Sequence, residues 1–173
     1  MKRILLVVIL LLCTVMIKAQ TPAQLDAKNG FNKFVLGSTL REISQIANLT
    51  KANNGSQYDA YYVKYPASYK LFGYSPKLIT LEFYDNLLTR IFINLPKPPT
   101  ISQDLACTTI VLNNYTDMYG DWTDLEASGN MLVQKMITGD KAILFYFLYR
   151  ESYISGDTYC YMSVPLMHLS TGL

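Results

Sequence analysis

The residue types that carry out acid–base or metal chemistry are sparse in this chain. Its 173 residues include one histidine, His168, close to the C-terminus. One histidine excludes multi-histidine metal sites and leaves a single base for any Ser-His-acid triad. Chain ends are often loosely held, so we expect no triad there. Glycine-rich phosphate loops, zinc-protease helices, Cys-x-x-Cys pairs and esterase nucleophile elbows are absent from the sequence. We therefore expect no catalytic residue, metal or cofactor.

An acidic segment surrounds the single tryptophan, Trp122. Oxygen ligands at this density could hold a calcium ion, and two carboxylates could instead form the pair that hydrolyses a glycosidic bond. The spacing matches no known calcium loop, and a solvated loop after a helix explains the acidic residues more simply. We expect no metal site, and a carboxylate-dependent hydrolase of envelope or dietary polysaccharide is the alternative function. The acidic residues are Asp117, Asp121, Asp124 and Glu126.

A cluster of tyrosines offers the clearest candidate binding surface. Tyrosine combines a flat apolar ring with a polar tip, which suits binding sites, although aromatic residues are also ordinary strand residues. On an alternating strand Tyr61 and Tyr65 share one face and Tyr62 lies on the other, so some of these rings must be outside the core. We predict a binding surface at these three residues, with Trp122 as a further contact. The cluster comprises Tyr58, Tyr61, Tyr62, Tyr65, Tyr69 and Tyr74.

The first twenty residues predict export. Two basic residues precede an apolar run at residues 4–17, and a small residue, Ala19, follows. The run is shorter than the roughly 20 apolar residues of a membrane-spanning helix. We predict a signal peptide over residues 1–19 and a mature chain that begins at Gln20, without a stable membrane span. Lipidation at Cys13 is less favoured, because no small residue precedes it. The periplasm, the cell surface and the exterior all stay open as destinations.

Processing changes the charge and the cysteine count. Removal of Lys2, Arg3 and Lys18 from the 15 basic residues leaves 12, against 13 acidic residues. No basic excess is left to neutralise phosphates, so nucleic acid is not an expected partner. Cys107 and Cys160 remain, and an oxidising compartment would permit a disulfide between them. Cys107 lies about 200° around the expected helix from Leu105, off its apolar stripe, which favours two separate thiols.

Hydrophobic patterning predicts one α+β domain over residues 31–173, after a flexible lead-in at residues 20–30. Capping boxes at Thr39–Glu42 and Thr100–Gln103 predict helices over residues 39–50 and 101–119. The second helix is expected to bury a stripe formed by Ile101, Leu105, Leu112, Tyr115 and Tyr119. Strands are expected at residues 31–36, 58–65, 78–84, 87–95, 131–138, 141–150 and 157–164.

These elements follow the order β-α-βββ-α-βββ. We therefore expect an antiparallel sheet of about seven strands with two helices on one face. Residues 34–43 (FVLGSTLREI) and the pair Tyr119-Gly120 resemble the helix boundaries of beta-lactamase-inhibitory-protein-like domains. The chain also resembles small outer-membrane assembly lipoproteins and secreted proteins of Bacteroidetes built on this scheme. The resemblance implies the fold and leaves the function open.

The expected function is an exported, non-enzymatic binding or interaction domain. Its expected partner is a protein or a glycan of the cell envelope or exterior. The high share of hydrophobic residues, 50%, fits a folded domain and excludes a disordered chain.

Overall fold

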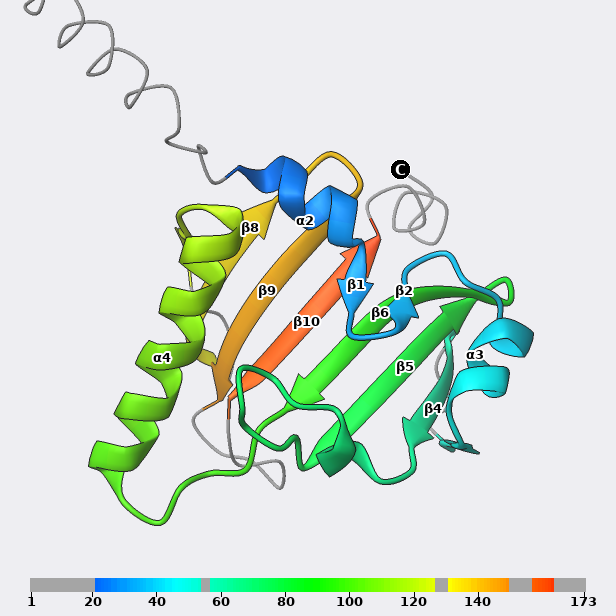
Figure 1. Cartoon of the computed structure of the whole chain (residues 1–173), viewed down its shortest axis with the longest axis horizontal. Coiled ribbons are helices and arrows are strands. Elements are labelled where there is room, and N and C mark those ends of the chain that lie inside the picture. The colour runs from blue at the N-terminus through cyan, green and yellow to red at the C-terminus, as the bar shows by residue number, and fades with distance from the viewer. Residues whose placement is uncertain (1–20, 54–56, 127–130, 150–156, 164–173) are drawn as a thin grey trace, which may run out of the picture.

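The computed structural model of the chain describes residues 21–53, 57–126, 131–149 and 157–163 (Figure 1). The predicted signal peptide, its cleavage site, Cys13 and His168 lie outside the described residues.

The fold is α+β, built on a large antiparallel sheet, as the sequence predicts. Within the described residues the sheet has eight strands in the order β3-β4-β5-β6-β10-β9-β8-β7, and every neighbouring pair is antiparallel. Its strands are β3 (Leu49–Lys51), β4 (Asp59–Val63), β5 (Leu78–Tyr84), β6 (Leu87–Asn94), β7 (Thr123–Leu125), β8 (Met131–Thr138), β9 (Ala142–Tyr149) and β10 (Thr158–Ser163).

Three helices and a small hairpin lie on one side of this sheet (Figure 1). The helices are α2 (Pro22–Lys28), α3 (Leu40–Ile46) and α4 (Ile101–Tyr119). The hairpin pairs β1 (Gly30–Phe31) with β2 (Phe34–Val35). We call the sheet face beneath these elements the inner face and the opposite face the outer face.

The expected count of about seven strands and two helices is corrected by the structure. Two short edge strands and one helix were not expected. The first predicted helix ends at Ile46, Ala47 is extended, and the chain then enters β3. At the other edge β7 lies in the acidic segment. Each edge strand has three residues, too few for the alternation that identifies a strand in a sequence.

The segment expected to be a flexible lead-in contains α2. Pro22 occupies the first helical turn, where its missing N–H costs no hydrogen bond, and Asn29 ends the helix in the left-handed conformation. Leu25 is fully buried. The Asp26 carboxylate accepts hydrogen bonds from the backbone N–H groups of residues 140 and 141 at 2.7 Å and of residue 142 at 2.9 Å. A single apolar anchor has no periodicity, so the sequence pattern could not reveal this helix.

Next to α2, the strand expected at residues 31–36 is the β1–β2 hairpin. The chain reverses at Asn32, whose φ of 53° is left-handed.

Of the two predicted capping boxes, the first is confirmed in full and the second in part. Thr39 and Glu42 form a reciprocal capping box, with the Thr39 N–H 2.8 Å from a Glu42 carboxylate oxygen. The Thr100 hydroxyl accepts from the Gln103 N–H at 3.3 Å and so caps α4. Asp85 and Asn86 both have positive φ, as a two-residue hairpin between β5 and β6 requires.

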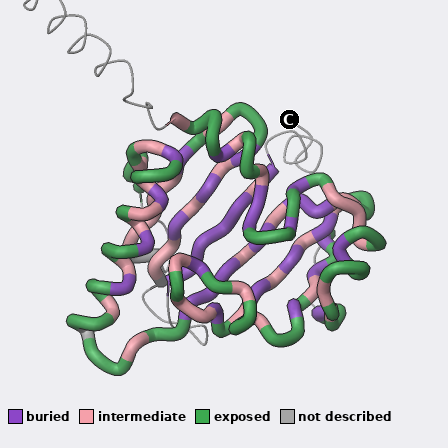
Figure 2. The backbone as a smooth tube through the Cα atoms, in the orientation of Figure 1, coloured by how far each residue is buried: buried purple, intermediate pink, exposed green. Residues whose placement is uncertain are grey.

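The core lies between the inner face and its covering elements (Figure 2). The α4 residues in the core are Cys107, Val111, Tyr115 and Tyr119, whereas Leu105 is 64% exposed. The predicted stripe is therefore confirmed at Tyr115 and Tyr119 and wrong at Leu105. The observed stripe has strict four-residue spacing, and its tyrosines bring hydroxyls that must be satisfied when buried. The Tyr161 hydroxyl donates to the Tyr115 hydroxyl at 2.9 Å and meets this need.

Candidate functional site

The outer face of the sheet is not covered by any helix in the part of the chain that the structure describes (Figure 1). One row of cross-strand partners runs across this face through all eight strands. Its members, in order, are Thr50, Tyr62, Thr80, Phe92, Cys160, Phe145, Met136 and Thr123.

The middle of the outer face is apolar. An uncovered face of an antiparallel sheet normally carries polar side chains, because water solvates it. Here the half-buried side chains on β6, β8, β9 and β10 are mostly aromatic or aliphatic, and we call them the outer patch. The Phe145 and Phe147 rings stack with centroids 5.5 Å apart and planes at 9°. The outer patch consists of Phe92, Met136, Ile143, Phe145, Phe147 and Met162.

A compact polar cluster adjoins the outer patch. The Arg90 guanidinium lies 4.2 Å from the Tyr58 ring centroid, donates to the Tyr58 hydroxyl at 2.9 Å and contacts the Glu82 carboxylate at 3.3 Å. Burial raises the pKa of Glu82, and the neighbouring Arg90 charge partly opposes that shift. Because the two charges pair with each other, this part of the outer face adds little net charge.

The three predicted tyrosines do not form one surface. Tyr61 lies on the inner face, where its ring meets the Phe83 ring edge-on at 5.6 Å. Tyr62 is 43% exposed and belongs to the outer face. Tyr65 is 76% exposed, has a left-handed φ of 58° and precedes the short 3-10 helix η1 (Pro66–Ser68). Of the three, only Tyr62 shares a face with the outer patch.

Trp122 is half-buried against the core. Its ring meets the Tyr115 ring at 6.0 Å, and its indole N–H donates to the Leu112 carbonyl at 3.2 Å. These contacts hold the end of α4 against the core. They lie beside β7, whereas the tyrosines on β4 lie near the opposite edge of the sheet.

The carboxylates of the acidic segment around Trp122 do not come together at one site in the described structure. Asp124 pairs instead with Lys135 on β8. Among the described residues, no three His, Cys, Asp or Glu side chains converge in a way that could hold a metal ion.

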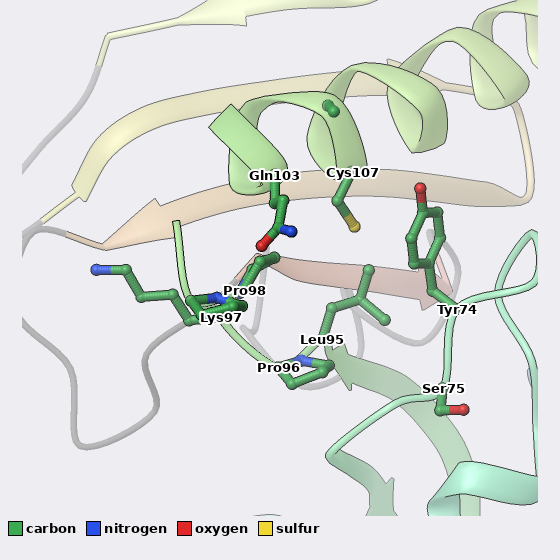
Figure 3. A pocket seen from close by; sticks show the side chains of 10 residues that line it. Tyr74, Ser75, Leu95, Pro96, Lys97, Pro98, Gln103 and Cys107 are labelled. Atoms are coloured by element: carbon green, nitrogen blue, oxygen red, sulfur yellow. The ribbon is translucent and has the colours of Figure 1, made fainter. Parts of the chain in front are cut away.

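A separate hollow of about 580 Å³ lies at the start of α4 (Figure 3). Three segments form it: the loop at Tyr74 and Ser75, the connector at residues 95–99, and the first turns of α4 at Gln103, Ala106 and Cys107. We call this hollow the proline pocket, after its three prolines. The sequence pattern did not reveal this pocket, because Tyr74 and Cys107 meet only in the folded chain.

A buried carboxyl group lies behind the proline pocket. Asp157 accepts a hydrogen bond from the Thr108 hydroxyl and another from the Tyr146 hydroxyl at 3.1 Å. Burial raises the pKa of Asp157, although these hydrogen bonds partly offset the shift. Burial also raises the pKa of the Cys107 thiol, and the Asp157 charge adds to that increase. Cys107 is therefore a protonated thiol at neutral pH, which is a poor nucleophile.

The two cysteines are both free and buried. Cys107 is on α4 above the inner face, whereas Cys160 belongs to the outer-face row between Phe92 and Phe145. The sheet itself separates the two sulfur atoms. The sequence favoured separate thiols because Cys107 was expected to face away from the sheet, but its side chain is in the core.

None of the helices in the described ranges is long and apolar enough to cross a membrane. Comparison with known proteins finds no matching family model, no similar curated protein and no similar solved structure.

Proposed function

We propose that this protein is an exported, non-enzymatic domain that binds another protein through the outer face of its sheet. The observation that carries the proposal is the outer patch, an apolar surface on a sheet face that no described helix covers. Contiguous apolar surface of this kind is characteristic of interaction sites. Aromatic and methionine side chains are also enriched where proteins meet.

The chemistry of the outer patch favours a protein over a glycan. Sugar rings stack on flat, accessible aromatic faces, and their hydroxyls need hydrogen-bonding partners. The stacking of Phe145 on Phe147 turns part of each ring face toward its neighbour. Phenylalanine, methionine and isoleucine offer no side-chain hydrogen bonds of conventional strength. An apolar surface of a protein partner matches such a patch better.

The alternative, a carboxylate-dependent hydrolase near Trp122, has less support. Asp124 is paired with Lys135, and Asp121 and Glu126 are exposed to solvent. A general acid in a glycosidase needs a raised pKa, which burial commonly supplies. Two further parts of this proposal are export and similarity to beta-lactamase-inhibitory-protein-like domains. Both are supported by the sequence patterns.

The proposal can be tested by photo-cross-linking. A p-benzoylphenylalanine residue at position 145 should cross-link one defined protein in envelope extracts. The same residue at position 105, an exposed position of α4, should not. The purified partner should then bind the Phe145→Asp variant at least tenfold more weakly than the wild type and bind Leu105→Asp normally. Equal cross-linking from both positions would contradict the proposal, as would unchanged affinity in Phe145→Asp. Loss of a glycan-array signal in Phe145→Asp, without any protein cross-link, would favour a glycan instead.

A further inference from the structure

The proline pocket has the size and the walls of a small-molecule site. Sites for small ligands are concave, mostly apolar and about 300–1,000 Å³ in volume, and this pocket measures about 580 Å³. Leu95, Pro96 and Pro98 lie below the start of α4 in Figure 3, and Pro99 is also part of the lining. Proline rings have fixed backbone φ and no rotatable side chain, so this wall is already shaped before a ligand arrives.

Few polar groups point into the pocket. In Figure 3 the Gln103 amide and the Cys107 sulfur are directed toward the same space, and Tyr74 stands beside the thiol. The Tyr74 hydroxyl and the Cys107 thiol are within hydrogen-bonding reach of each other. The Gln103 amide can both donate and accept, so it can hold one polar atom of a ligand without requiring a charge.

The charges around the pocket disfavour an anion. The carboxyl groups of Asp104 and Asp157 lie close enough to Cys107 to act on its titration. Lys97 contributes to the lining, but its side chain extends away from Gln103 and Cys107 in Figure 3. An anionic group that reached the thiol would therefore meet negative charge without a compensating cation.

We infer that the proline pocket binds a small, uncharged aromatic molecule, with its ring against the proline wall and one polar atom on the Gln103 amide. This site is independent of the outer patch, because it is built from α4 and the connector rather than from the outer face.

A pair of fluorescent probes tests both the shape and the charge preference. N-phenyl-1-naphthylamine is uncharged, and 1-anilinonaphthalene-8-sulfonate has the same rings with one added sulfonate. The purified protein should bind the uncharged probe saturably, with one site and at least tenfold higher affinity than the sulfonate. No saturable binding of the uncharged probe, or tighter binding of the sulfonate, would overturn the inference.

Two matched variants locate the binding site. Ala106→Trp places a large ring in the pocket and should weaken binding of N-phenyl-1-naphthylamine at least tenfold. Leu105→Trp adds the same ring to the neighbouring exposed position of α4 and should leave the affinity within twofold of the wild type. Thermal unfolding of both variants shows whether they are folded. If Ala106→Trp is folded and binds normally, the site is wrong.

A third variant separates this inference from the proposed function. Phe145→Asp alters the outer patch and should leave probe binding unchanged. Loss of probe binding in Phe145→Asp, with normal binding in Ala106→Trp, would place the probe on the outer face and refute the pocket.

Discussion

Tyr61 and Tyr62 are adjacent in β4 and lie on opposite faces of the sheet. Tyr61 contacts Phe83 edge-on on the inner face, and Tyr62 is 43% exposed on the outer face. This division follows from the two-residue period of a strand. The Tyr61 ring packs against the core, whereas Tyr62 lies on the same face of the sheet as the outer patch.

Alanine substitutions should separate these roles. Tyr61→Ala removes a ring that packs against the core and should lower the free energy of unfolding by about 2 kcal/mol. Tyr62→Ala should lower it by less than about 0.5 kcal/mol, as is usual for exposed positions, while weakening binding of the partner. Urea unfolding and affinity measurements on both variants check this. A larger loss of stability in Tyr62→Ala would show that the faces were assigned incorrectly.

The contact between α2 and the β8–β9 turn should depend on pH. Burial disfavours the charged form of Asp26, but hydrogen bonds from three backbone N–H groups and the nearby Lys141 charge outweigh it, so the pKa falls below its ordinary value of 3.8. A carboxyl group with a lowered folded-state pKa stabilises the fold above its unfolded pKa, and this contribution disappears as the pH falls through the folded pKa. Asp26→Ala should therefore cost about 1 kcal/mol at pH 7, a modest value because Asp26 is partly exposed, and progressively less as the pH falls below 3.8.

Gly139 provides a control for the same contact. A side-chain carbon at this position would overlap the Asp26 carboxylate, so Gly139→Ala should displace that carboxylate. Denaturant unfolding of the two single variants and the double variant measures their coupling. The double variant should be no less stable than the worse single variant, since both changes disrupt one contact. Fully additive losses would contradict this account of the turn.

The sequence predicted strands β5 and β6 and the N-terminal caps of α3 and α4, because those features depend on neighbouring residues. It could not identify the outer patch. The apolar run from Ala142 to Leu148 presents hydrophobic side chains on both faces of β9, so its pattern cannot say which face is covered. The proline pocket was equally hidden, since the contact between Tyr74 and Cys107 depends on the tertiary fold.

The cysteines should remain reduced even under oxidising conditions. The sheet separates Cys107 from Cys160, and burial raises the pKa of both thiols, which slows oxidation and alkylation. Mass spectrometry of the native protein at pH 7 should find two free thiols, labelled by iodoacetamide much faster after unfolding. A disulfide-linked peptide containing both residues would refute this separation.

Hydroxyl-radical footprinting of the complex tests the central claim most directly. Met136 belongs to the outer patch, whereas Met118 is 37% exposed on α4, on the other side of the sheet, so the two methionines form a matched pair. Binding of the partner identified by cross-linking should slow oxidation of Met136 at least fivefold and leave the rate at Met118 unchanged. Protection of Met118 with no protection of Met136 would place the partner on the helical side and contradict binding through the outer face.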